Sequence, residues 1–163
     1  MDKAFTFIEL IIVITVTTLL SGIALVNYQR IGGQEKLQKD AKQFERILFL
    51  AKEKASAAET LQCDSTDPGI GELIGFKVDL TSNDYYLIEV CQNQEFIISA
   101  QHFSPSISAI NNTSVTFRKS DMGITSNVIV SFGIRSILIN NNNCRSYDVS
   151  PSGAIDELSP YTC

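Results

Sequence analysis

The sequence is organised around its first stretch, Met1–Tyr28, MDKAFTFIELIIVITVTTLLSGIALVNY. A short charged lead is followed by an apolar run from Phe5 to Val26, in which Glu9 is the single charged residue. As a helix, this run is about 33 Å long, close to the hydrocarbon thickness of a bilayer. An ionised carboxylate in such a segment is costly, so we expect Glu9 to have a function and a partner.

The expected partner of Glu9 is a new N-terminus. Peptidase cleavage after Ala4 would leave the α-amine of Phe5 as the first group of the chain. Within one helix this amine and the Glu9 carboxylate lie near the same end. We therefore expect the amine to pair with Glu9 of a neighbouring copy displaced along the helix axis, where low dielectric strengthens an ion pair. The alternative is a plain signal anchor that tolerates one Glu near the membrane interface.

Residues Ala4–Leu10 and the following Ile-Ile-Val-Ile resemble the prepilin processing motif of type IV pilins and type II secretion pseudopilins. The resemblance implies that Ala4 precedes the cut, that Phe5 becomes the N-methylated first residue, and that Glu9 guides subunits into a helical filament. Two positions depart from the commonest pattern. Ala4 stands where family leaders usually end in Gly, and Phe7 stands where Leu is more frequent.

The same resemblance implies a structural subunit of a type IV pilus or pseudopilus, a minor pilin or pseudopilin, and not an enzyme. Its partners would be other pilin or pseudopilin subunits, prepilin peptidase and methylase, the inner-membrane assembly platform and membrane lipid. Before assembly it would be a single-pass protein of the cytoplasmic membrane with its head outside the cytoplasm, and afterwards part of the filament. The predicted divisions are a leader (1–4), a transmembrane or filament-core helix (5–28), an amphipathic helical half (29–60) and a β-rich globular head (61–163).

Helical periodicity returns between Gln34 and Glu59. The preceding pair Gly32-Gly33 predicts a bend or a frayed joint between the apolar segment and the head. Apolar residues then recur at steps of three and four, which predicts a single buried stripe. A coiled-coil seam is the less favoured interpretation, because the pattern lasts fewer than three heptads. The stripe consists of Leu37, Ala41, Phe44, Leu48, Ala51 and Ala55.

Short β-rich runs separated by turn residues fill the rest of the chain. A helix followed only by such runs predicts an α+β, pilin-like fold in which an antiparallel sheet covers the helical stripe. Two segments of the tail, 128–133 and 145–153, also resemble the closing strands of the H class of pseudopilins and of minor pilins. The predicted strands are Leu73–Leu80, Asp84–Val90, Glu95–Ala100, Ser114–Lys119, Asn127–Phe132, Arg135–Asn140, Arg145–Ser150 and Ala154–Asp156.

Four cysteines lie beyond the apolar segment: Cys63, Cys91, Cys144 and Cys163. An even number in this position predicts two disulfides formed in an oxidising compartment. Three pairings are possible, and proximity in sequence favours Cys63–Cys91 and Cys144–Cys163. None of the four belongs to a Cys-x-x-Cys pair, so no metal site is predicted.

The head has no feature of an enzyme or a nucleic-acid-binding protein. From Leu61 onward it holds eleven acidic and five basic residues, a net charge of −6, without a basic cluster. Three acidic residues, Asp64, Asp67 and Glu72, lack the order of a calcium loop. His102 lies near Ser104, but no nucleophile elbow is present. We therefore predict neither catalysis nor a cofactor.

Two alternatives to a purely structural subunit remain open. Tyrosines at 85, 86, 147 and 161 could form the ligand surface of a filament-tip adhesin or ligand-binding minor pilin, which exposure of the Tyr85-Tyr86 hairpin would favour. A non-polymerising single-pass membrane-anchored domain is the other alternative. Replacement of Glu9 by Ala distinguishes this anchor from a subunit that polymerises.

Overall fold

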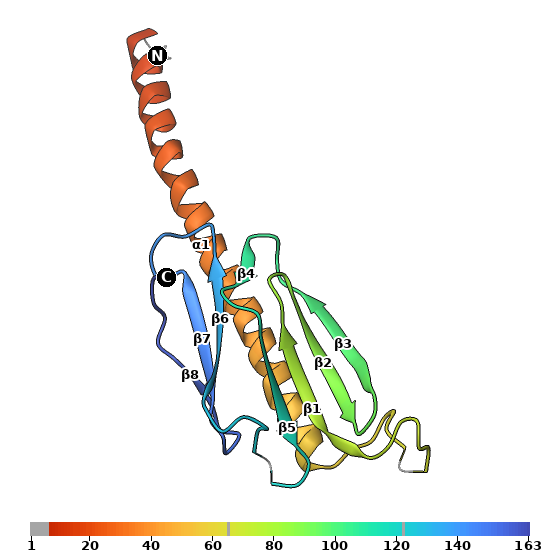
Figure 1. Cartoon of the computed structure of the whole chain (residues 1–163). Helices are drawn as coiled ribbons and strands as arrows, with labels where there is room; N and C mark the ends of the chain where they lie inside the picture. The colour runs from red at the N-terminus through yellow and green to blue at the C-terminus, as the bar shows by residue number, and fades with distance from the viewer. Residues whose placement is uncertain (1–6, 65, 122) are drawn as a thin grey trace.

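The computed structural model describes residues 7–64, 66–121 and 123–163, and for residues 22–30 the backbone alone. Within these residues the chain forms one helix followed by eight strands, an α+β fold as predicted (Figure 1). The elements are α1 (Phe7–Ser56), β1 (Leu73–Leu80), β2 (Asp84–Cys91), β3 (Glu95–His102), β4 (Ile107–Ala109), β5 (Thr113–Arg118), β6 (Val130–Ser136), β7 (Cys144–Val149) and β8 (Ile155–Glu157).

The helix α1 is 50 residues long and continuous. No proline interrupts it, because the first proline of the chain is Pro68. At its end Ala58 adopts a left-handed φ of 49°, and the N–H of Glu59 donates to the carbonyl of Lys54 at 3.2 Å. This arrangement satisfies one of the last helical carbonyls.

Fraying at Gly32-Gly33, one of the two forms predicted for this joint, is wrong, because α1 passes through both residues without a break. Gly33 instead allows close packing. A Cβ added at Gly33 would lie 3.1 Å from Cγ2 of Ile139 and 3.3 Å from Cβ of Leu138, so the segment after β6 touches the helix here. A cost of about 1 kcal/mol per helical glycine does not break a helix whose neighbouring turns are packed.

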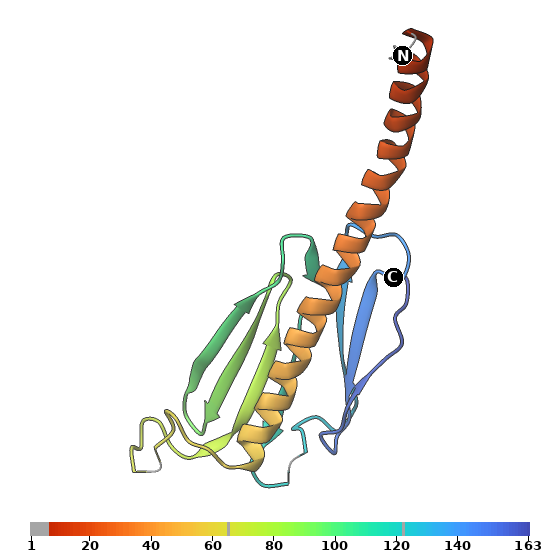
Figure 2. The ribbon, with the colours of Figure 1, turned by 180° about the vertical axis from the view of Figure 1, so that it is seen from behind.

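The head consists of two antiparallel sheets, with strand orders β3-β2-β1-β5 and β4-β6-β7-β8. The second half of α1 lies against both of them, while its first half projects away from the head (Figures 1 and 2). The sequence predicts antiparallel strands over the helix, and the structure divides these strands into two sheets.

The core forms where the helical stripe meets the sheets. All six residues of the predicted stripe are buried, with exposed fractions of 2% or less. The ring centroid of Phe44 lies 5.4 Å from those of Tyr85 and Phe132 and 6.0 Å from that of Tyr147. Since Tyr85 belongs to β2 and the other two to β6 and β7, Phe44 joins α1 to both sheets. Burial of such a side chain contributes about 1.5–3 kcal/mol.

Two polar contacts fix the rotation of α1 in the head. The hydroxyl of Tyr147 donates to the carbonyl of Ala41 at 3.0 Å. On the preceding helical residue, the buried carboxylate of Asp40 accepts bonds from the N–H of Ser104 at 2.7 Å and from its hydroxyl at 3.2 Å. Neighbouring helical residues are thus held by two different parts of the head.

Most predicted strands agree with the structure to within two residues, but one region differs. The two strands predicted at 127–132 and 135–140 are a single strand, β6. Gly133 lies within the strand and not in a turn. Its lack of a side chain leaves room for Ile110, because a Cβ added at Gly133 would lie 2.7 Å from Cδ1 of Ile110. Strand β4 was not predicted, because the serines and the proline of the segment 104–108 indicate a loop.

Candidate functional site

The first half of α1 presents apolar side chains on every face. Ten large apolar residues between Phe7 and Leu20 have exposed fractions of 45–79%. They are Phe7, Ile8, Leu10, Ile11, Ile12, Val13, Ile14, Val16, Leu19 and Leu20. These residues lie on more than one side of the helix, so contact with a single surface would not bury all of them. A continuous apolar surface of this kind marks an interaction with other apolar groups.

The hydroxyl groups in the same segment are bonded within the helix. Thr15, Thr17, Thr18 and Ser21 donate to carbonyl oxygens three or four residues earlier, at 2.7–3.0 Å. These hydroxyls therefore need no water or external acceptor. The polar residues of the segment are thus compatible with an apolar environment.

Glu9 lies in the first turn of α1 and is exposed. Negative charge at a helix N-terminus is favourable by about 0.3–1 kcal/mol, so the carboxylate suits this turn. Ala4 and Phe5, the predicted cleavage and methylation positions, lie outside the described residues. The predicted pairing of the Phe5 amine with Glu9 of another copy therefore stays a prediction. Among the residues that the structure describes, no helix is both long enough and apolar enough to span a membrane.

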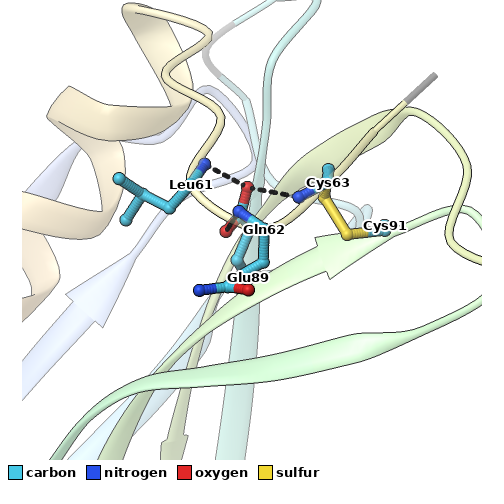
Figure 3. The surroundings of a disulfide bond; sticks show 5 residues. All are labelled: Leu61, Gln62, Cys63, Glu89 and Cys91. Atoms are coloured by element: carbon cyan, nitrogen blue, oxygen red, sulfur yellow. Dashed lines mark hydrogen bonds between the residues drawn. A yellow bond between two sulfur atoms is a disulfide. The ribbon is translucent and has the colours of Figure 1, made fainter. Parts of the chain in front are cut away.

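The disulfides of the head join Cys63 to Cys91 and Cys144 to Cys163, the two pairs favoured by proximity in sequence. Glu89 lies beside the first of them and is fully buried (Figure 3). Its Oε1 accepts the N–H groups of Leu61 at 2.9 Å and Cys63 at 3.3 Å, and its Oε2 accepts the N–H of Gln62 at 2.9 Å. One carboxylate therefore holds the segment that leads from α1 to the head.

Cys63, Cys91 and Glu89 are also the one group of possible metal ligands found among the described residues. In this structure the two sulfurs are bonded to each other, and the carboxylate accepts three backbone N–H groups. Disulfide sulfur is not a thiolate ligand. In the oxidised chain this cluster therefore serves the structure.

The acidic loop after Cys63 also uses its carboxylates for local structure. Asp64 accepts bonds from the N–H of Thr66 at 2.8 Å and from its hydroxyl at 2.7 Å, and these bonds lower the pKa of Asp64. Asp67 accepts the N–H of Gly69 at 2.7 Å. Both side chains stabilise turns, as Asp commonly does.

His102 and Ser104 do not form a catalytic pair. His102 is exposed on β3, and its Nδ1 pairs with the carboxylate of Asp84. The hydroxyl of Ser104 donates to Asp40. A nucleophile and its base must be bonded to each other, and here each is bonded to a different carboxylate.

Of the four tyrosines considered for a ligand surface, Tyr161 alone is exposed, with an exposed fraction of 39%. Tyr85 and Tyr147 are core residues with exposed fractions of 1% and 0%, and Tyr86 is half-buried. Burial, with the nearby charge of Asp40, raises the pKa of Tyr85 to about 12. Burial also raises the pKa of Tyr147, and the charges of Glu157 and Glu45 add to the effect. The exposure that would favour an adhesin is absent at Tyr85.

Two buried carboxylates with structural contacts, Glu89 and Asp40, were missed from the sequence. A signal for Glu89 was present: it continues the alternation of Tyr85, Leu87 and Cys91, all of which face the interior. Asp40 follows Leu37 by three residues, which places it beside the buried stripe.

No protein-family model, curated protein or solved structure matches the chain.

Proposed function

We propose that this chain is a structural subunit of a type IV pilus or pseudopilus, a minor pilin or pseudopilin that assembles through the first half of α1. The observation that carries the proposal is an apolar helical segment, exposed on every face, whose only charged residue is Glu9. The processing motif Ala4–Leu10 supports the same conclusion. In this proposal the chain has a structural function and does not catalyse a reaction.

The assembly mechanism follows from the chemistry of this segment. Burial of ten large apolar side chains against the helices of other subunits removes their surface from water or lipid and packs them densely. Glu9 sets the axial position of each helix, because its carboxylate is stabilised where it meets the positively charged amine of Phe5 in an adjacent subunit. A mismatched axial position would leave a charge in an apolar environment, which is strongly disfavoured.

Before assembly, the proposed chain is held in the cytoplasmic membrane by the same segment, with the head outside the cytoplasm. The apolar run in the sequence extends from Phe5 to Val26 and includes residues beyond the described part of the helix. The membrane anchoring is therefore proposed from the sequence. Two disulfides in the head suit an oxidising compartment.

The test is the incorporation of E9A into filaments in cells that carry the assembly machinery. We expect the filament fraction of E9A to fall at least about tenfold while the protein accumulates in the membrane fraction, since breaking a buried ion pair costs about 3–5 kcal/mol. The matched control is E35A, which removes an exposed carboxylate from α1 outside the apolar run. Intact-mass analysis of the wild-type chain should give a methylated chain that begins at Phe5.

Two results would contradict the proposal. Incorporation of E9A at the wild-type level would show that Glu9 is not needed for assembly. A chain that floats with membranes but never enters filaments would be the non-polymerising anchor. No contact of the described residues favours the adhesin over the structural subunit or over the non-polymerising anchor.

A further inference from the structure

The segment between β6 and β7 presents two apolar side chains to solvent. Ile137 and Leu138 have exposed fractions of 69% and 52%, whereas the next residue, Ile139, is buried in the core. This segment lies at the end of the head from which α1 projects (Figures 1 and 2). We name residues 137–138 the exit tip, because they lie where the helix leaves the head.

The exit tip is held in a defined conformation. The N–H of Ile137 donates to the carbonyl of Ser106 at 3.1 Å, and the N–H of Leu138 donates to the hydroxyl of Ser136 at 3.3 Å. The buried side chain of Ile139 anchors the segment against Gly33 of α1. The exposure of two large apolar side chains is therefore a built feature of the head.

The exit tip lies at a suitable height for a membrane surface. Gly33, which it touches, follows Val26, the end of the apolar run, by seven residues, or about 10 Å of helix. The polar interface on each side of a bilayer is roughly 5–8 Å thick, so the tip lies just outside the interface of an upright helix and reaches it when the helix tilts, as membrane helices do by about 20° on average. Ile31, between these two helical positions, is also exposed.

The charges around the exit tip also favour a membrane. Although the head carries a net charge of −6, residues 136–144 contain no charged side chain. Arg135 immediately precedes them and is exposed, and on α1 Glu35 and Lys36 are both exposed within one turn of Gly33, so these three groups sum to a single positive charge. Positive charge beside an uncharged apolar tip suits a surface of anionic lipids.

We propose that Ile137 and Leu138 insert into the lipid interface of the membrane that holds α1, and so orient the head before assembly. The inference rests on the proposed function, because it requires the apolar segment to be anchored in a bilayer. A second copy of the chain is the rival occupant of the exit tip. Lipid is favoured because the tip lies beside the emerging helix, toward the apolar segment.

The test uses the absence of tryptophan from the chain. I137W places a single reporter at the exit tip, and V128W places one before β6, at the opposite end of that strand. The matched positions have exposed fractions of 69% and 68%. Each full-length chain is reconstituted into vesicles of phosphatidylcholine and phosphatidylglycerol, with or without brominated acyl chains. L138W is a second reporter at the tip.

We expect I137W and L138W to emit at shorter wavelength than V128W and to lose at least about half of their emission in brominated vesicles, because tryptophan favours the membrane interface. V128W should keep its emission. Equal, unquenched emission from all three variants would overturn the inference. A blue shift without quenching by brominated lipid, which grows with the protein-to-lipid ratio, would show that a second copy of the chain covers the tip and would overturn the inference.

Flotation of the same samples separates this inference from the proposed function. Chains that do not float with the vesicles would refute both the membrane anchoring and the lipid contact. Chains that float with a quenched tip reporter, but fail to enter filaments, would support the lipid contact and refute assembly. Near-ultraviolet circular dichroism checks that each variant keeps the wild-type head.

Discussion

Replacement of Glu89 by Gln tests the contact that holds the segment between α1 and β1. The wild-type carboxylate is fully buried and accepts three backbone N–H groups, two on Oε1 and one on Oε2. An amide has a single acceptor oxygen. If that oxygen occupies the place of Oε1, the amide NH₂ faces the N–H of Gln62, and two donors are left buried without an acceptor.

The expected cost follows from these contacts. A hydrogen bond to a charged group contributes about 1.5–3 kcal/mol, and a buried unsatisfied donor costs about 1–3 kcal/mol. The neutral amide recovers part of the cost of burying a charge. We therefore expect E89Q to lower the free energy of unfolding by about 2–3 kcal/mol, or the melting temperature by roughly 5–10 °C for a chain of this size.

The assay is denaturant unfolding of the oxidised full-length chain in detergent micelles, followed by near-ultraviolet circular dichroism of the tyrosines. The matched control is E95Q, on the neighbouring strand, whose exposed carboxylate pairs with Lys77. An exposed ion pair contributes about 0–1 kcal/mol, so E95Q should unfold nearly as the wild type does. Amide exchange should accelerate at Gln62 in E89Q alone.

The reasoning would be refuted if E89Q lost no more stability than E95Q and the exchange rate of the Gln62 amide stayed unchanged. Such a result would mean that the chain between α1 and β1 is held by its disulfide and not by the buried carboxylate.

The remaining predictions concern pH and two glycines. Burial raises the pKa of Tyr85 to about 12, above its value of about 10 in the unfolded chain, so stability should be complete below pH 10 and fall between about pH 10 and 12. Y85F and Y147F should each flatten this fall in alkaline unfolding curves, and unchanged slopes would contradict the assignment. G75A should unfold the head, because its Cβ would lie 1.9 Å from the carbonyl oxygen of Phe117, whereas G32A faces open space and should stabilise α1 by about 0.5–1 kcal/mol. Equal thermal stability of the two glycine variants would refute the packing argument.

Local patterns predicted the secondary structure well where one face of an element is buried. The three-and-four spacing from Leu37 to Ala55 identified the buried stripe, and a β-rich run bounded by turn residues identified β1 with its observed limits. The same patterns failed near β6. There Val128, Ile129, Ile137 and Leu138 are apolar but exposed, so apolar residues beyond both ends of the strand were assigned to it.

The sequence by itself determined the order of helix and strands, the buried face of α1 and the apolar character of its first half, because these properties depend on periodicity and composition along the chain. Only the tertiary structure decided the division into two sheets, the role of Gly33 and the partners of Asp40 and Glu89. Each of these depends on which distant backbone groups arrive at one point. Glu89 is buried at little cost because residues 61–63 bring three N–H donors to its carboxylate, a coincidence that no local pattern encodes.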